Sequence, residues 1–347
     1  MKQVRIKDIA KLSGFSIGTV DRVLHNRGEV AADTKEKILK IARELDYKPN
    51  IVAQALTTKK QYKIAVLIPR ADKDNSFWAM HPAGINKALN ELRPFKVNVS
   101  YYLFELHNEA DFLSKAEDLL NDEPEGVILA PILRKESLHI CSRLEEKGVP
   151  YIFIDSHIEN CGNLSFLGEN AYKSGRVAAS LVDFGVGADN DVLVVNIAKD
   201  LENTRHLYSR TRGFMNYFGE GGRNKGRKIT VEIESSNMDT VRQKLNKVFA
   251  DYPDIGAILV SSAKTHIVAS YLEEKGLKDI ILVGYEMTKE NLDFLKHGII
   301  NFLIGQRPVE SSEKALKMMF EHLTTGKTFS KEEFQPVEII NPENADF

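Results

Sequence analysis

A serine at the start of a short amphipathic segment is the first residue whose type and position indicate a chemistry. Ser16 follows a turn at Gly14 and precedes apolar residues at helical spacing, among them Val20 and Val23. A serine in this position caps a helix, because its hydroxyl accepts a hydrogen bond from an amide of the first turn. The free amides of such an end favour phosphate, and the first side chains of an exposed helix can contact base edges in a DNA major groove. This segment therefore predicts a surface that reads DNA.

The neighbouring residues predict the helices that position this surface. The apolar side of a first helix is predicted to contain Ile6, Ile9, Ala10 and Leu12. The second helix repeats this spacing with Val20, Val23 and Leu24. Two short helices joined by a tight turn are the layout of a helix-turn-helix. A third helix, residues 32–45, completes the core with Ile38, Leu39, Ile41, Ala42 and Leu45.

Charge is distributed unevenly along the chain. Residues 1–60 contain 13 Lys and Arg against 7 Asp and Glu, a net charge of +6. The whole chain has a net charge of −2, so the remaining residues sum to −8. A basic head on an acidic body is expected where only the head contacts nucleic acid. A solvated surface with clustered charges is the alternative, and the helix-turn-helix pattern in the same residues counts against it.

A proline after the third helix marks the end of the head. Pro49 stops any helix, and Asn50 can cap a new short one over residues 51–56. A helix this short is marginal alone. It is either a linker or a segment that folds only against DNA and its twin, with Leu56 inserted into the minor groove.

The runs RIKDIAKLSGFSIGTVDRVLHNRGEV and YKPNIVAQALTTKK, within residues 4–60, resemble the DNA-binding head and hinge helix of the LacI/GalR (lactose-repressor) family. The resemblance implies DNA contacts from Lys7, Ser16, Ile17, Gly18, Thr19, Asp21, Arg22, Asn26, Asn50, Ala53, Gln54 and Leu56. Asp21 stands where the family usually has serine; a carboxylate there repels phosphate, yet it can accept from a cytosine amino group. Gly18 lacks a side chain that relatives use for base contact. We therefore expect an operator that differs from the common family sequence.

The rest of the chain alternates between apolar strands and amphipathic helices. Strands are predicted at residues 64–68, 97–103, 126–130, 149–154, 192–197, 230–233, 257–260 and 280–283. This βα repetition predicts parallel sheets that are covered by helices on both faces. Two such stretches with facing strand ends form a cleft that suits a small ligand.

This half resembles the type I periplasmic sugar-binding fold, the effector domain of the same family. The resemblance covers residues 62–340 in the order of its elements. We therefore expect an all-α helix-turn-helix head (1–48), a hinge helix and linker (49–61) and a two-lobed α/β effector-binding body with parallel sheets (62–347). The N-terminal lobe is placed at about 62–157 and 307–330, and the C-terminal lobe at about 158–306 and 331–347.

The same resemblance implies a set of effector contacts, namely Asn75, Phe77, Trp78, Asp155, Arg210, Ser262, Glu286 and Gln306. Aromatic rings would stack on a sugar, although core packing is the alternative for Phe77 and Trp78. Asp155, Arg210 and Glu286 could instead form a structural ion-pair set. Ser156, Ser262 and Glu286 depart from the ribose-type pattern, so a neutral sugar, a uronate and a sugar phosphate all stay open. A guanidinium such as that of Arg210 suits a neutral or an acidic ligand.

Other kinds of site lack their sequence patterns. The histidines show no metal-ligand spacing, and the glycines of residues 219–223 follow a helix without the Lys-Ser/Thr of a phosphate-binding loop. We therefore expect no metal, no cofactor and no enzyme activity. A charged N-terminus, unpaired Cys141 and Cys161 and the lack of a long apolar stretch predict a cytoplasmic, nucleoid-associated protein without membrane contact.

The sequence thus predicts a transcriptional regulator, most simply a repressor, whose sugar-like effector acts allosterically on binding to an operator. Two-fold protein symmetry predicts a near-palindromic operator, and the lack of a heptad tail after residues 337–340 predicts a homodimer. An extracytoplasmic sugar-binding transport or receptor protein is the alternative, and a sugar-modifying enzyme with a DNA-binding appendage is a third. The operator sequence, the regulated genes and the choice between induction and corepression stay open.

Overall fold

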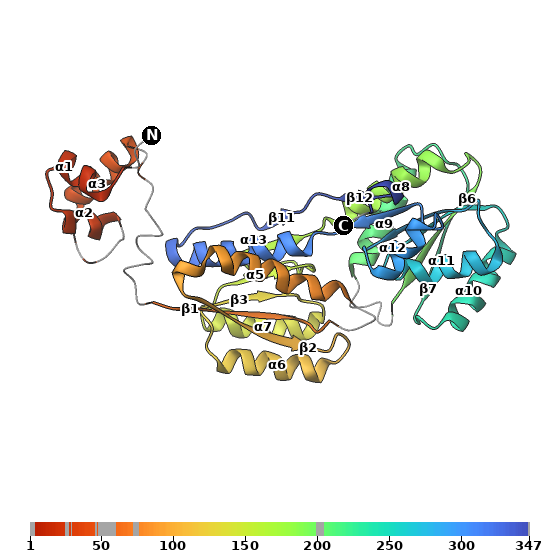
Figure 1. The fold of residues 1–347 in the computed structure, drawn as a ribbon, viewed down its shortest axis with the longest axis horizontal. Helices are drawn as coiled ribbons and strands as arrows, with labels where there is room; N and C mark the ends of the chain where they lie inside the picture. The colour runs from red at the N-terminus through yellow and green to blue at the C-terminus, as the bar shows by residue number, and fades with distance from the viewer. Residues whose placement is uncertain are drawn as a thin grey trace. The chain divides into compact units, whose positions relative to one another are not determined.

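The computed structural model describes residues 4–24, 28, 30–45, 47, 60–71, 76–198 and 205–345 (Figure 1). The chain divides into two compact units, Met1–Lys60 and Gln61–Phe347. Residues 49–59 of the predicted hinge and linker (49–61) lie outside the described residues, as do the predicted contacts Asn26, Asn50, Ala53, Gln54, Leu56 and Asn75. Within the described ranges, no helix is both long enough and apolar enough to cross a membrane.

The first unit contains the three predicted helices, α1 (Ile6–Ser13), α2 (Ile17–Leu24) and α3 (Ala32–Glu44). Its core consists of Ile9, Ala10, Val20, Val23, Ile38 and Ala42, all of them buried. The prediction was wrong for Leu12, whose side chain is 61% exposed. Successive helical residues are about 100° apart, and the buried side of α1 runs through Ile9, Ala10 and Ser13, which leaves Leu12 on its flank.

The second unit contains two six-stranded sheets, each with helices on both faces. The first sheet has the order β2-β1-β3-β4-β5-β11, and all of its strands are parallel. Its strands are β1 (Tyr62–Pro69), β2 (Val97–Phe104), β3 (Gly126–Leu129), β4 (Tyr151–Ile154), β5 (Ser165–Gly168) and β11 (Glu332–Phe334). We call this sheet and its helices the first lobe.

Alternate residues of β1 contact the two helical layers of the first lobe. Ile64, Val66 and Ile68 face α5 (His81–Glu91) and α13 (Pro308–Thr325), which lie on one side of the sheet in Figure 1. Ala65 and Leu67 face α6 (Glu109–Asn121) and α7 (Arg134–Glu146) on the other side. The short 3-10 helices η1 (Ser76–Met80) and η2 (Arg93–Phe95) flank α5.

The second sheet repeats this order as β7-β6-β8-β9-β10-β12. Its strands are β6 (Asp191–Ile197), β7 (Lys228–Ile233), β8 (Ile255–Val260), β9 (Ile281–Tyr285), β10 (Phe302–Gly305) and β12 (Glu338–Ile340). The covering helices are α8 (Ala171–Gly185) and α9 (Arg205–Gly219) on one face, and α10 (Met238–Asp251), α11 (Thr265–Lys275) and α12 (Lys289–Lys296) on the other. A 3-10 turn, η3 (Pro342–Asn344), follows β12. This second lobe departs from the predicted parallel pattern only at β12, which pairs antiparallel with β10.

The predicted lobe boundaries differ from the observed sheets at two places. Residues 165–168, predicted for the second part of the body, form β5 and pair with β4 in the first lobe. Residues 332–334 form β11 beside β5, also in the first lobe. The chain therefore passes between the lobes after β5, after β10 and between β11 and β12. These three crossovers define the place where both lobes can contribute to one site.

Candidate functional site

The entry into α2 has the geometry of a capped helix. Gly14 adopts a left-handed conformation (φ 74°), and its amide donates to the Ala10 carbonyl oxygen to end α1. The Thr19 amide donates to Ser16 Oγ at 3.1 Å, so the predicted cap is confirmed. The Ser16 and Thr19 hydroxyls also lie 2.9 Å apart and can share a hydrogen bond. The cap fixes where the first side chains of α2 emerge from the head.

The start of α2 is open to solvent. Ile17 is 58% exposed, an unusual position for a large apolar side chain, and Gly18 beside it is also exposed. The Arg22 Nε–H donates to the Gly18 carbonyl oxygen at 3.3 Å, which lays the arginine along the exposed side of the helix. Lys7 of α1 is exposed as well. The predicted contact residues of α1 and α2 therefore lie on or beside a solvent-facing surface.

Asp21 is only partly exposed and lies near the aromatic residue that follows α3. Burial, together with the charge of Asp21, raises the pKa of the Tyr47 hydroxyl above its ordinary value. Asp21 thus interacts with Tyr47 inside the head. Its position in the sequence also predicts that it repels phosphate or accepts from a cytosine amino group.

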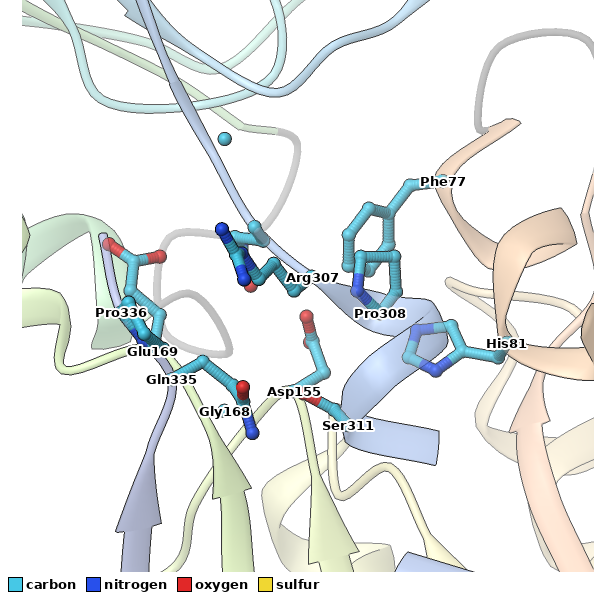
Figure 2. Close-up of a pocket in the computed structure, with 12 residues that line it drawn as sticks. Phe77, His81, Asp155, Gly168, Glu169, Arg307, Pro308, Ser311, Gln335 and Pro336 are labelled. Atoms are coloured by element: carbon cyan, nitrogen blue, oxygen red, sulfur yellow. The ribbon is translucent and has the colours of Figure 1, made fainter. Parts of the chain in front are cut away.

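The second unit holds a pocket where the three crossovers meet (Figure 2). It contains about 320 Å³ of space free of protein atoms, a figure that includes open solvent. We call it the interlobe pocket, and it is lined by Phe77, His81, Asp155, Gly168, Glu169, Gly305, Gln306, Arg307, Pro308, Ser311, Gln335 and Pro336.

Two acidic residues occupy matching places in the two lobes. Asp155 follows β4 and Glu286 follows β9, the fourth strand of each sheet when counted from β2 or β7. Both have positive φ angles, 64° and 69° respectively, which are uncommon for residues other than glycine. Each amide donates to the neighbouring strand, Asp155 to the Leu167 carbonyl oxygen and Glu286 to that of Ile304. Such backbone strain is frequent at ligand sites.

Arg210 is the centre of the charged groups behind the pocket. Its side chain is 2% exposed, and Nη1 donates to the Ser261 carbonyl oxygen at 2.7 Å. Nε and Nη2 donate to the two carboxylate oxygens of Glu169, which makes this pair bidentate. Glu286 lies 3.7 Å from Nη2, and the guanidinium lies 3.7 Å from the centre of the Tyr285 ring. Arg210 thus forms ion pairs with Glu169, which was not predicted, and with Glu286 of the predicted set.

Two carboxyl groups near Arg210, those of Asp155 and Glu286, have raised pKa values. Burial raises the pKa of Asp155 to about 7, against the opposing effects of Arg210 and the Ser156 hydroxyl. Burial raises the pKa of Glu286 to about 7 as well, and the charges of Glu169 and Asp155 add to this shift. One guanidinium thus faces more carboxyl groups than it can neutralise, and two of them hold protons close to neutral pH.

The remaining predicted contacts separate into pocket residues and buried neighbours. Phe77 and Gln306 line the pocket, and Gln306 Nε2 donates to Glu286 Oε1 at 2.5 Å. Trp78 is 5% exposed within the core of the first lobe, so its role here is packing. Ser262 is buried, and its hydroxyl accepts from the Lys264 amide at 3.4 Å. Four of the predicted contacts that the structure describes are not lining residues, namely Trp78, Arg210, Ser262 and Glu286.

Sequence reasoning missed several pocket residues. Glu169 follows β5, a strand that was not predicted, so nothing placed it near Arg210. Arg307 pairs through Nη2 with Glu338 across another crossover. His81 begins α5 and reads in the sequence as an ordinary helix residue. Across the described part of the chain, no group of three or more His, Cys, Asp or Glu could hold a metal ion.

Similar proteins are found for both units. RegA, an HTH-type transcriptional regulator of Clostridium saccharobutylicum, is 34% identical over 145 residues, 42% of each chain. ExuR of Bacillus subtilis, a probable HTH-type transcriptional repressor, is 25% identical over 334 residues, 92% of each chain. The chain spans between 40% and 49% of the length of the first curated relatives that it matches.

The second unit also resembles solved structures. A candidate LacI transcriptional regulator from Bacteroides fragilis superposes with a TM-score of 0.74 at 24% identity, over 82% of this chain and 98% of that one. This likeness concerns the fold alone. The family model of the lacI family of bacterial regulatory proteins matches residues 5–50, and that of the periplasmic binding protein domain matches residues 64–328. The chain therefore belongs to the periplasmic binding protein domain family and carries a lacI family domain at its head.

Proposed function

We propose that this protein is a DNA-binding transcriptional regulator, a repressor whose operator affinity is controlled by a sugar or sugar derivative in the interlobe pocket. The observation that carries the proposal is the capped, exposed start of α2 in a lacI family domain, on the same chain as a two-lobed body with a pocket. Regulators and repressors named among the relatives support it.

On this proposal the head supplies sequence recognition. A homodimer presents two copies of α2 to the half-sites of a near-palindromic operator, because two-fold protein symmetry is matched by the DNA. Ile17, Thr19 and Arg22 offer apolar and hydrogen-bonding contacts to base edges, and the free amides of α2 favour phosphate. The site of action is the bacterial nucleoid in the cytoplasm, and the protein has no catalytic role.

The pocket supplies the control. Carboxyl and amide groups such as Asp155 and Gln306 can hydrogen-bond sugar hydroxyls, and the Phe77 ring can pack against the apolar face of a sugar. Because the lining comes from both lobes and their crossovers, a bound ligand favours one arrangement of the lobes over others. A ligand and DNA that favour different arrangements are coupled in free energy, which is all that allostery requires.

The alternative of an extracytoplasmic sugar-binding protein accounts for the body only. The basic head and its match to the lacI family over residues 5–50 have no place in that function. If the alternative were correct, the full chain would not bind DNA.

Selection of duplex DNA from a random pool with the full chain tests the proposed function. We expect an enriched near-palindrome, bound with an affinity that changes when one sugar of a panel is added. The panel contains D-glucose, D-galactose, D-ribose, L-arabinose, D-galacturonate and D-glucose 6-phosphate. Arg22→Ala should weaken binding to the selected duplex about tenfold or more, since a good base or phosphate contact contributes about 1–3 kcal/mol.

Lys40→Ala is the matched control, because Lys40 is an exposed basic residue of α3. It should change operator affinity far less than Arg22→Ala. A pool without enriched sequences, or equal effects of the two variants, would contradict the assignment of α2 as the reading helix.

A further inference from the structure

We infer that His81 is a specificity-determining contact of the interlobe pocket, which offers its Nε2 to a hydroxyl group of the effector. Ser312 is the positioning residue that orients the imidazole. The inference rests on the proposed function of the pocket as an effector site, and it assigns a contact outside the predicted set of effector residues.

One ring nitrogen of His81 lacks a hydrogen-bond partner among the described residues. The residue is 1% exposed, and its Nε2 is buried without a hydrogen-bond partner among the residues that the structure describes. A buried polar atom without a partner costs free energy that a hydrocarbon side chain of similar size avoids. A leucine would fill this core position without that cost, so the presence of histidine calls for a compensating role.

The place of His81 connects the free nitrogen to the pocket. His81 is the first residue of α5 and one of the residues that line the pocket. In Figure 2 its ring extends from α5 toward Pro308 and Asp155, on the same side of the pocket as Phe77. The ring therefore lies in the wall of the pocket, and because it is 1% exposed, a ligand reaches its Nε2 only in a lobe arrangement that opens this wall.

Aromatic neighbours hold the ring in one orientation. Trp78 stacks on the imidazole with ring centres 4.9 Å apart and planes inclined by 20°. Phe77 approaches it edge-on at 5.3 Å. The rotation of the ring is then set by Ser312, a fully buried residue of α13 whose Oγ lies 2.7 Å from Nδ1. The direction of Nε2 is thus fixed before any ligand arrives.

The chemistry of the ligand group follows from the state of the ring. Burial lowers the pKa of His81 to about 3, so the imidazole is neutral at physiological pH. If Ser312 donates to Nδ1, Nε2 carries the proton and donates to the ligand; if Nδ1 donates to Ser312, Nε2 accepts. A hydroxyl group both donates and accepts, so it satisfies either tautomer. The inferred partner is therefore one hydroxyl of a polyhydroxylated ligand.

Three substitutions at this position separate a ligand contact from a packing role. His81→Leu keeps the volume and removes both nitrogens, Gln has an amide nitrogen that reaches about as far as Nε2, and Asn reaches only about as far as Nδ1. We expect H81L to weaken binding of the best panel sugar tenfold or more. H81L also leaves the buried Ser312 hydroxyl without its partner, so the melting temperature of the protein without sugar should fall, whereas H81N keeps a group at the place of Nδ1. H81Q should retain more affinity than H81L or H81N.

The matched control is Ser137→Ala. Ser137 lies in α7, outside the pocket lining, and its buried hydroxyl also lacks a partner among the described residues. S137A should leave sugar affinity unchanged. S137A therefore shows whether removing any buried polar atom without a partner changes sugar affinity, or only one that lines the pocket.

Monodeoxy derivatives of the same sugar provide the decisive measurement by calorimetry on the full chain. One derivative should bind the wild type about tenfold more weakly than the parent sugar does. H81L should bind this derivative and the parent sugar with equal affinity. Equal discrimination by wild type and H81L, or wild-type affinity in H81L, would overturn the inference and leave the proposed function standing. If H81L does not fold, the same comparison with H81N decides, because Asn reaches only about as far as Nδ1. A wild-type chain that binds no panel sugar would refute the proposed effector site, and the inference with it.

Discussion

At the scale of single residues, Arg210 was predicted to contact a ligand, and its guanidinium is bonded to other residues of the protein. Its bidentate partner Glu169 and the Ser261 carbonyl oxygen occupy three of its N–H directions. Both side chains are nearly inaccessible, 2% and 9% exposed. Pairs of this kind are costly to break, because one buried charge is left without its partner.

Glu169→Gln should therefore lower the free energy of unfolding by at most about 3 kcal/mol, because Glu286 lies 3.7 Å from Nη2 and can take over part of the pairing with Arg210. The Gln keeps the shape of the side chain and removes its charge, so the loss is electrostatic. Glu220→Gln is the matched control: it breaks the pair between Arg176 and Glu220, whose carboxylate is 58% exposed, and should cost less than about 1 kcal/mol. Denaturant unfolding of both variants measures the difference, and equal losses would mean that the buried pair contributes no more than a surface pair.

The sequence could predict single site residues only where a pattern marked them. Ser16 was found from its own type and position, and its cap bond is observed. Asp155, Arg210 and Glu286 were suggested by resemblance, and the structure brings them together. Glu169 was missed because its pairing depends on a crossover between distant elements, which no local periodicity reveals.

At the scale of elements, the position of Arg210 depends on two helices that touch through glycines. A Cβ atom at Gly213 of α9 would lie 2.0 Å from the Tyr172 carbonyl oxygen of α8. A Cβ atom at Gly175 of α8 would lie 2.0 Å from the carbonyl oxygen of Arg210 itself. Backbone atoms cannot give way as a flexible side chain does, so the two helices can only move apart.

Gly213→Ala should separate α8 from α9 and displace the guanidinium from Glu169. We expect a loss of about 1–3 kcal/mol of stability, the usual cost of overpacking, and weaker binding of the panel sugar. Gly219→Ala at the other end of α9 is the control, since a Cβ atom there meets nothing within 4 Å. Thermal unfolding and sugar titration of both variants test this coupling, and a G213A protein that behaves like G219A would contradict it.

The strands of the body were only partly predictable from apolar runs in the sequence. The eight predicted strands are present, because runs such as residues 64–68 are apolar throughout. The four missed strands have only three or four residues, and β11 at the sheet edge is Glu-Glu-Phe, which carries no apolar pattern. Their omission moved the predicted lobe boundaries, since β5 and β11 decide where the first lobe ends.

At the scale of the whole molecule, the two lobes have the same strand order and interact electrostatically through one acidic residue of each. Each sheet places an acidic residue with positive φ after its fourth strand, Asp155 in the first lobe and Glu286 in the second. The charge of Asp155 contributes to the raised pKa of Glu286, so each lobe affects ionisation in the other. The protonation of the pocket is therefore a property of the assembled body.

This arrangement makes the stability of the unliganded body depend on pH. The pKa of Glu286 is about 7 in the folded protein against 4.5 for an unperturbed glutamate. Between these values the folded state holds more protons than the unfolded state, so stability is greatest at the acid end and falls as the pH rises toward 7. Each such group contributes a slope of about 1 kcal/mol per pH unit.

Glu286→Gln removes one of these groups and should flatten the fall in the free energy of unfolding between pH 5 and 8. Its stability relative to the wild type should accordingly rise with pH across this window. Glu274→Gln, at an exposed pair with Arg242 in the same lobe, should leave the slope unchanged, because the pKa of Glu274 is lowered and the group stays ionised over the whole range. Denaturant unfolding at pH 5, 6, 7 and 8 measures the three slopes. A wild-type slope in E286Q would mean that Glu286 is ionised throughout and that the second lobe holds a permanent negative charge beside Arg210.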